Sequence, residues 1–475
     1  MQGTTEITKE ESDAFSYLTP LGKLKTRDSR AISDSPLSIG LETRDRNLYD
    51  PARVYPHLLE LGVKHARLHS GWCLCEKKPG IYSFEWLDEM VDTLLGMGIE
   101  PWLTLCYGNR LYHPDAPYEH AVGWIPLTSP EAKAAWCAYV RALAMHFKGR
   151  VRHFEVWNEP DLGVFWRPAC KGDPAGYVEL VRTTAPIIRK CVPDAVVCGG
   201  AIADYRDDYF LPDIVNLGVG KWLDKITYHA YRKSPEVDDS AAYAALRELV
   251  RRDNPAMELW NGESGAPSDP RGFGAMCRFD WNEDRQARWL LKRIVNDLSH
   301  GIELVSYFHA ADLRHFAGRA PAHQRYAYYG LLRGDDYSRK PSFYAMQSLC
   351  TLFADGIKTS ESGWMYFRRT DDYAPGQFRY RLFRRGNTPL LAFWNTMPVF
   401  ATEPADRHDI DFSLGHSGLR LREPVLVDPL RQMVYLVPPE ESLDGRRSSF
   451  LEMPVLNYPL FVTEASAVEW QQVQI

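Results

Sequence analysis

The sequence predicts an α/β protein, with a closed (β/α)8 barrel of the TIM type followed by a smaller all-β domain. Short apolar runs alternate with amphipathic helical patterns over residues 36–354. The alternation stops there, and residues 355–475 hold short strand-like segments separated by turn residues. Strands alternating with helices over ~320 residues suit a parallel barrel with insertions. A doubly wound open sheet is the structural alternative, because periodicity does not show whether a sheet closes.

Eight strands are predicted in the first region, and most are short and apolar, as strands buried on both faces should be. In chain order they are Leu37–Glu42, His65–His69, Glu100–Tyr107, Arg152–Trp157, Val196–Ala201, Lys225–Tyr231, Met257–Glu263 and Ile302–His309. In a barrel, the carboxyl ends of all eight meet at one rim, where active sites of this fold lie.

The helices between these strands are predicted from periodicity and end signals. Apolar residues recur at helical spacing over 87–95, and Gly98 follows as a stop. Ser129 and Pro130 indicate a helix start, because serine caps a helix and proline suits its first turn. The clearest stripe covers 287–298. These patterns supply the helical layer that a parallel barrel requires.

The last region is predicted to be a sandwich-like accessory domain, because its strands are short and long helical stripes are absent. Its predicted strands are Trp364–Arg369, Phe378–Arg384, Pro389–Asn395, Pro424–Val427, Met433–Val437 and Pro459–Thr463. Residues 1–35 show no clear period and stay unassigned. The expected domains are therefore an N-terminal segment (1–35), a catalytic barrel (36–354) and the accessory domain (355–475).

Charge and composition exclude some classes of partner. The 56 basic and 62 acidic residues give a net charge of −6, so no overall basic field for nucleic acid exists. No apolar run reaches the length of a membrane span. Nine scattered cysteines are typical of reduced thiols, and the first residues lack a signal-peptide pattern, so we expect a cytoplasmic protein. A removed signal peptide is the alternative, and a homo-oligomer stays open.

Two glutamates stand at predicted strand ends. Glu159 ends strand four, in HFEVWNEP, and Glu263 ends strand seven, in ELWNGES. Glu155 and Glu258 lie deeper in the same strands. Two carboxyl groups across a pocket can cleave a glycosidic bond, one protonating the leaving oxygen and the other attacking the anomeric carbon. The pair predicts a retaining glycoside hydrolase with carboxyl groups about 5–5.5 Å apart.

The text around Glu159 carries a family resemblance. Trp157-Asn158-Glu159-Pro160 resembles the strand-four signature of retaining glycoside hydrolases of clan A. The longer stretch FEVWNEPDLGVFW most resembles glycoside hydrolase family 39, which includes β-xylosidases and α-L-iduronidases. The resemblance implies that Glu159 is the acid/base, that Glu263 is the nucleophile and that Asn158 holds the sugar 2-hydroxyl. The strand-seven text WNGESG departs from the family's xylosidases and is closer to other clan members.

Other rim residues are expected to support the glutamates or bind substrate. The clan resemblance implies that Arg67, at the end of strand two, keeps Glu263 ionised. It also implies that His229 and Tyr231, on one face of strand six, bond the nucleophile and line the sugar site. For Arg67 the alternative role is a structural ion pair. For Trp124 and Trp260, which could stack on sugar faces, the alternative is packing in the core. The remaining predicted substrate-binding residues are His69, Tyr107, Asn109, His309, Trp124 and Trp260.

The predicted function is an exo-acting β-glycosidase of β-xylosidase type, whose partner is an oligosaccharide or glycoside substrate. Segments 108–127 and 264–281 follow strands three and seven. They could close one end of the pocket, which favours exo action. β-Glucosides, β-galactosides and α-L-iduronides are alternative substrates, and a non-catalytic carbohydrate-binding barrel is the alternative function. No cofactor or metal is predicted, because the sequence has no HExxH motif.

Overall fold

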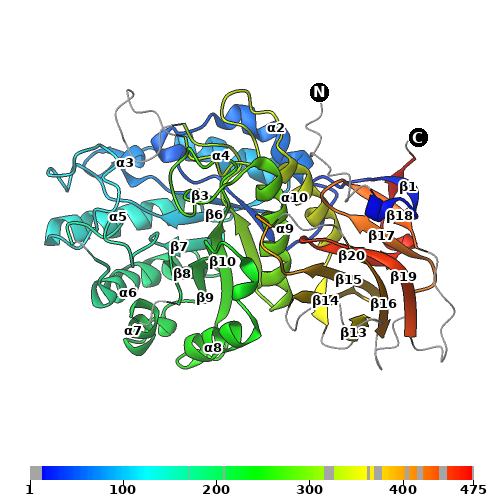
Figure 1. Cartoon of the computed structure of the whole chain (residues 1–475). Coiled ribbons are helices and arrows are strands. Elements are labelled where there is room, and N and C mark those ends of the chain that lie inside the picture. The colour runs from blue at the N-terminus through cyan, green and yellow to red at the C-terminus, as the bar shows by residue number, and fades with distance from the viewer. Residues whose placement is uncertain are drawn as a thin grey trace.

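The structure is a computed structural model. It describes residues 13–169, 171–206, 209–314, 326–360, 364–367, 377–401, 406–413, 421–437 and 447–472. Figure 1 shows a barrel with its helices on one side of the molecule and an all-β region, coloured yellow to red, on the other. Cys170 and the end of the predicted strand Trp364–Arg369 lie outside the described residues. The predicted fold class is confirmed.

The barrel consists of eight parallel strands that follow one another in chain order. They are β2 (Leu37–Gly40), β3 (His65–His69), β6 (Glu100–Leu105), β7 (His153–Val156), β8 (Val196–Ile202), β9 (Lys225–His229), β10 (Glu258–Ser264) and β11 (Leu304–Tyr307). The sheet closes because β11 pairs with β2, with Val305 opposite Leu37. Closure excludes the doubly wound open sheet. All eight predicted strands are present, several ending before the rim residues expected within them.

Helices surround this barrel. The α-helices are α2 (Pro51–Leu61), α3 (Trp72–Cys75), α4 (Glu85–Gly96), α5 (Pro130–His146), α6 (Pro174–Cys191), α7 (Phe210–Asn216), α8 (Ser240–Arg251), α9 (Glu283–Ser299) and α10 (Pro341–Leu352). Short 3-10 turns are η1 (Arg44–Arg46), η2 (Val219–Lys221) and η3 (Pro235–Val237), and a small hairpin joins β4 (Glu76–Lys78) to β5 (Ile81–Tyr82). The predicted cap is present, since the Ser129 side chain accepts a hydrogen bond from the Ala132 amide at 3.0 Å.

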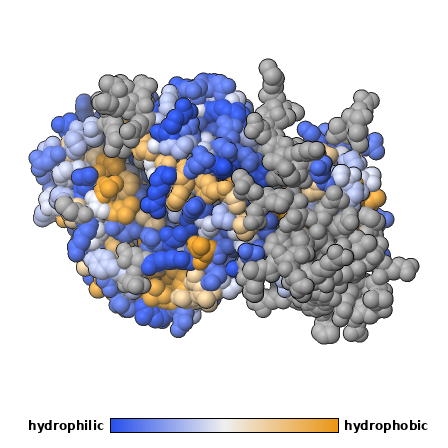
Figure 2. All heavy atoms as spheres, viewed as in Figure 1, coloured by the Kyte–Doolittle hydropathy of each residue, from blue (hydrophilic) through white to orange (hydrophobic). Residues whose placement is uncertain are grey.

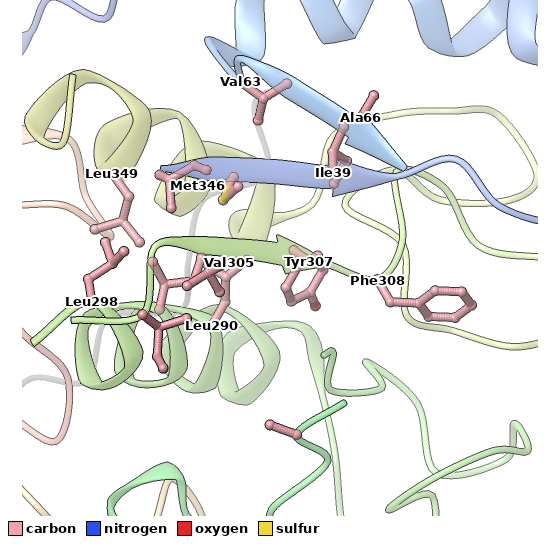
Figure 3. Packing of buried hydrophobic residues seen from close by; sticks show 14 of the residues in the cluster. Ile39, Val63, Ala66, Leu290, Leu298, Val305, Tyr307, Phe308, Met346 and Leu349 are labelled. Carbon is pink, nitrogen blue, oxygen red and sulfur yellow. The ribbon is translucent and has the colours of Figure 1, made fainter. Parts of the chain in front are cut away.

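The main hydrophobic core lies between the strands and the helical layer. Figure 3 shows Leu290 of α9 close to Val305 of β11, while Met346 and Leu349 come from α10. These side chains are all buried. Burial of this apolar surface supplies most of the free energy that holds helices on the barrel. No helix among the described residues is both long and apolar enough to cross a membrane.

The accessory region contains two antiparallel sheets. The larger has the order β12 (Lys358–Ser360), β14 (Phe378–Arg385), β15 (Thr388–Asn395), β20 (Leu460–Glu464), β17 (Pro424–Asp428), β18 (Met433–Leu436), β1 (Thr19–Leu24) and β21 (Trp470–Gln471). The smaller contains β13 (Trp364–Phe367), β16 (Asp406–Ser413) and β19 (Arg447–Val455). β1 comes from the segment to which the sequence assigned no structure, and it pairs with β18 and β21.

Helices α9 and α10 lie against both the barrel and the larger sheet. Every residue of α9 from Gln286 to Ser299 is buried. Lys292 of this helix donates a hydrogen bond to the Met397 carbonyl at 2.7 Å, and Ser348 of α10 donates one to the Pro429 carbonyl at 2.8 Å. The two regions therefore share a buried interface. On the face drawn in Figure 2, the described surface is mostly hydrophilic, with small separated hydrophobic areas.

Candidate active site

Glu159 and Glu263 face each other at the carboxyl end of the barrel. The side chains of Glu159 and Glu263 are 12% and 11% exposed, and His229 is fully buried between them. The His229 Nδ1 atom lies 2.9 Å from Glu159 Oε1 and 3.9 Å from Glu263 Oε2. One carboxylate oxygen of each glutamate lies within 4.8 Å of the other. This spacing is typical of retaining rather than inverting glycosidases, whose carboxyl groups are about 6.5–9.5 Å apart.

The backbone around Glu159 departs from a regular strand. Trp157 has φ of +69° and Glu159 has φ of +47°, both left-handed values that non-glycine residues seldom adopt. The Glu159 amide donates to the Ala201 carbonyl at 2.9 Å, and the Trp157 indole donates to the Phe165 carbonyl at 2.8 Å. These bonds hold the strained turn in place. As a result, the consecutive side chains of Asn158 and Glu159 both join the same cluster, Asn158 bonded to Arg67 and Glu159 to His229, which strand alternation would not allow.

Arg67 lies below the two glutamates as a fully buried cation. Its Nε and Nη2 atoms donate to Glu155 Oε2 at 3.0 and 2.7 Å. Its Nη1 atom donates to Glu263 Oε2 at 2.7 Å and to Glu42 Oε1 at 3.2 Å. Nη2 also donates to Asn158 Oδ1 at 2.8 Å. One guanidinium therefore fixes Glu263 and Asn158 relative to each other.

Burial shifts the pKa values of Glu159 and His229. It raises the pKa of the Glu159 carboxyl to about 7, although the positive charge of Arg67 opposes the rise. Burial also lowers the pKa of His229 below its ordinary value, despite the charge of Glu263. A neutral imidazole beside a carboxyl that holds its proton near neutrality is suited to general acid/base chemistry.

Other predicted residues also reach this site. The Tyr231 hydroxyl donates to Glu263 Oε1 at 2.7 Å. The Asn158 amide donates to the Tyr107 hydroxyl at 2.8 Å. The ring of His69 lies 5.5 Å from that of Tyr107, and His69 Nδ1 lies 3.3 Å from Arg46 Nη2. His229 hydrogen-bonds Glu159 and not Glu263, the residue it was expected to bond, and its full burial makes it a partner of the carboxyl group rather than a wall of the sugar site.

Trp260 is a correction, because the structure places it away from the rim. Its indole donates to Glu303 at 2.7 Å and lies edge-on to Trp102 at 5.5 Å. Glu303 directly precedes β11, so this contact is at the amino end of the strands. Trp260 lies three residues before Glu263 in β10, toward the amino end of the strand, and the ladder is irregular between Asn261 and Glu263. Trp260 is a core residue at the opposite end of the barrel.

Asn109 and His309 are also engaged elsewhere. The Asn109 amide donates to the Glu76 carbonyl at 2.8 Å and accepts from the Leu111 amide at 3.0 Å, so it orders the loop after β6. His309 is fully buried, and its ring nitrogens lie 3.0 Å from the carbonyls of Ala311 and Glu42. Neither side chain has a group left to point at substrate.

Trp124 stays a candidate for stacking on a sugar face. It is partly buried, with its ring 5.8 Å from that of His113 and its backbone bridged to Arg167. These contacts place it where the loop after β6 meets the loop after β7. No described contact joins it to Glu159 or Glu263.

Sequence reasoning missed Glu42 and Arg46. Glu42 is the last residue of the first predicted strand, and reading the rim there would have found it. Arg46 lies in η1 and has its guanidinium 5.8 Å from the Tyr107 ring centroid. No motif marks Arg46, because its place beside Tyr107 depends on how the loop after β2 folds back over the barrel.

Known proteins resemble the chain over this same region. The model of the family "Glycosyl hydrolases family 39" matches residues 57–257, which include Glu159 and end before Glu263. This confirms the resemblance to family 39. Two curated relatives of the chain are named β-xylosidase. The one from Caldicellulosiruptor saccharolyticus is 28% identical over 336 residues, covering 63% of this chain and 64% of that protein.

The second relative, from Geobacillus stearothermophilus, is 29% identical over 185 residues, covering 37% of this chain and 35% of that protein. The matches thus span less than two thirds of the length of either relative. Among solved structures, a family 39 glycoside hydrolase from Bacteroides cellulosilyticus WH2 has a TM-score of 0.65 at 18% identity, covering 90% of this chain and 80% of that one. A monomeric β-xylosidase from Caulobacter crescentus CB15 has a TM-score of 0.61 at 18% identity, covering 95% and 98%. These likenesses show the fold.

Proposed function

We propose that the chain is a retaining glycoside hydrolase in which Glu263 is the nucleophile and Glu159 the general acid/base. The observation that carries this proposal is the approach of the two carboxyl groups to within 4.8 Å, with Arg67 bonded to Glu263 and a neutral His229 bonded to Glu159. The two environments push the glutamates toward different roles, because a cation touches one and burial holds a proton on the other.

The reaction proceeds by double displacement. In the first step, a Glu263 oxygen attacks the anomeric carbon, the bond to the glycosidic oxygen breaks, and Glu159 gives its proton to that leaving oxygen. In the second step, the Glu159 carboxylate takes a proton from water. The water oxygen then attacks the anomeric carbon, which releases the sugar and restores the Glu263 carboxylate.

Three neighbours assist this chemistry. Arg67 and Tyr231 each donate to a different oxygen of Glu263, so the nucleophile is held in one orientation before substrate arrives. Asn158 accepts from Arg67 and donates to Tyr107. Its amide is therefore fixed beside the anomeric centre, where it would hold the sugar 2-hydroxyl.

We propose exo action on a β-xyloside as the leading substrate assignment. The names of the two curated relatives support it, and so does the loop after β6, whose Tyr107 accepts a hydrogen bond from Asn158. β-Glucosides, β-galactosides and α-L-iduronides are the alternatives. A non-catalytic carbohydrate-binding barrel would need a lost carboxylate, and both Glu159 and Glu263 are in place.

Aryl glycosides with and without azide test the roles. Glu159→Ala keeps the nucleophile, so a substrate with a good leaving group still forms the glycosyl-enzyme, and azide should then give a β-glycosyl azide. Glu263→Ala lacks the nucleophile, so azide should enter from the other face and give the α-azide. Glu258→Ala is the matched control, because this partly buried residue of β10 pairs with Arg251 far from the rim.

Azide products of the same anomer from both variants would contradict the assignment. Full activity in Glu159→Gln or Glu263→Gln would remove that residue from the mechanism. A panel of xylosides, glucosides, galactosides and iduronides, assayed on the unchanged enzyme, would identify the sugar.

A further inference from the structure

Glu42 is a third buried carboxyl group beside the catalytic pair, and the mechanism above does not use it. It follows β2 and is 1% exposed. Its Oε1 accepts one hydrogen bond, at 3.2 Å from Arg67 Nη1. Its Oε2 is buried without a hydrogen-bond partner among the described residues. A Cβ on Gly40 would stand 2.3 Å from Oε2, so this glycine provides the space that the carboxyl group fills.

The charges around Arg67 do not balance. Glu155 accepts from two nitrogens of Arg67 and from the hydroxyls of Thr104 and Thr227 at 2.6 and 2.5 Å. Glu263 accepts from Arg67 and Tyr231. Glu42 receives only the longest of these Arg67 bonds. One cation therefore faces three carboxyl groups, and Glu42 is the least compensated as an anion.

Two neighbours of Glu42, His309 and Tyr49, carry no positive charge of their own. His309 Nε2 lies 3.9 Å from Glu42 Oε2 but only 3.0 Å from the Glu42 carbonyl. Burial lowers the pKa of His309 to about 4, so the ring is neutral. The Tyr49 hydroxyl donates to the Leu41 carbonyl, and burial raises its pKa well above the ordinary value. Glu263 is a further neighbour, and its charge opposes an anion at Glu42.

We propose, resting on the function above, that Glu42 is a positioning residue that must hold a proton for the enzyme to work. As a neutral acid it leaves Arg67 Nη1 to Glu263, so the nucleophile stays fixed. As an anion it forms a stronger charge-assisted bond with the same nitrogen and draws it away from Glu263. Burial, although opposed by Arg67, raises the pKa of Glu42 to about 8. The ionisation of Glu42 is thus an alkaline switch.

The test must separate Glu42 from Glu159, because both would lower activity in alkaline solution. In a 2,4-dinitrophenyl glycoside of the preferred sugar, the dinitrophenolate group leaves without needing a proton. For this substrate kcat/KM therefore does not depend on Glu159 as an acid. With this substrate, kcat/KM of the unchanged enzyme should fall about tenfold from pH 7 to pH 9, as Glu42 loses its proton. Glu42→Gln keeps the shape and the neutral charge, so its profile should be flat over that range.

Glu42→Asp retains an ionisable group and should show a fall again, while the control Glu258→Gln should follow the unchanged enzyme. A flat profile for the unchanged enzyme would overturn the inference without any variant. So would a fall in Glu42→Gln equal to that of the unchanged enzyme, with the fold at pH 9 checked by circular dichroism. No hydrolysis of any aryl glycoside by the unchanged enzyme would instead contradict the proposed function.

Discussion

Replacing Arg67 by lysine should destabilise the protein strongly although the charge is kept. Arg67 makes five hydrogen bonds, to Glu42, Glu155, Glu263 and Asn158. A lysine ammonium has three donors on one atom and does not reproduce the planar fork. At least two bonds are therefore lost, each contributing about 1.5–3 kcal/mol when it involves a charged group. We expect a loss of about 3–6 kcal/mol, a large part of the 5–15 kcal/mol typical of a domain.

Urea unfolding followed by tryptophan fluorescence measures this loss, because Trp102 packs beside the Arg67 guanidinium at 5.4 Å. Arg150→Lys is the matched control. Arg150 pairs with Asp88 and Asp92 on the surface, with its side chain 29% exposed. Exposed pairs contribute about 0–1 kcal/mol. An Arg67→Lys protein as stable as Arg150→Lys would refute the view that Arg67 holds the site together.

Three further outcomes are expected. For an alkyl glycoside, which needs a proton on its leaving oxygen, kcat/KM of the Glu42→Gln variant should fall about tenfold per pH unit above the Glu159 pKa of about 7, and a constant kcat/KM to pH 9 would exclude Glu159 as the acid. The folded-state pKa values of Glu159 and Glu42 lie above the ordinary glutamate value of 4.5, so the stability they give is complete below that value and is lost as the pH rises through about 7 and 8. The urea midpoint should therefore drop less between pH 5 and pH 9 in Glu42→Gln. A chelator should leave hydrolysis unchanged. Added Zn²⁺ should inhibit the enzyme by bridging Glu159, His229 and Glu263. If Zn²⁺ restored activity after chelation, that result would contradict a metal-free mechanism.

The barrel could be predicted from the sequence because its signals are local. Each strand is a short apolar run, and each neighbouring helix has its own stripe and end residues. The same locality made Glu159 and Glu263 visible, since each needs only its own strand end to be placed at the rim. Strand β1 gave no such signal. Its segment TPLGKL lacks alternation, and its partners β18 and β21 lie near the other end of the chain.

The rest of the site depends on contacts between distant strands. Arg67 was expected beside Glu263, but the sharing of its guanidinium among β2, β7 and β10 follows from barrel closure and has no linear pattern. Trp260 was misplaced because its depth in the strand was not considered: it lies earlier in β10 than Glu263, and its indole bonds Glu303 at the amino end of the barrel. Glu42 was overlooked for a simpler reason, since the rim was not read at the first strand.

The pairing of β1 has a consequence for how the chain is made. β1 ends at Leu24, and its neighbour β18 begins at Met433, so roughly four hundred residues separate them. At a synthesis rate of about 5–20 residues per second, β1 waits about 20–80 s on the ribosome before β18 emerges. During that time the barrel can close while β1 remains an unpaired strand with free backbone groups. The nascent protein is then open to aggregation and to chaperone binding while its barrel is already folded.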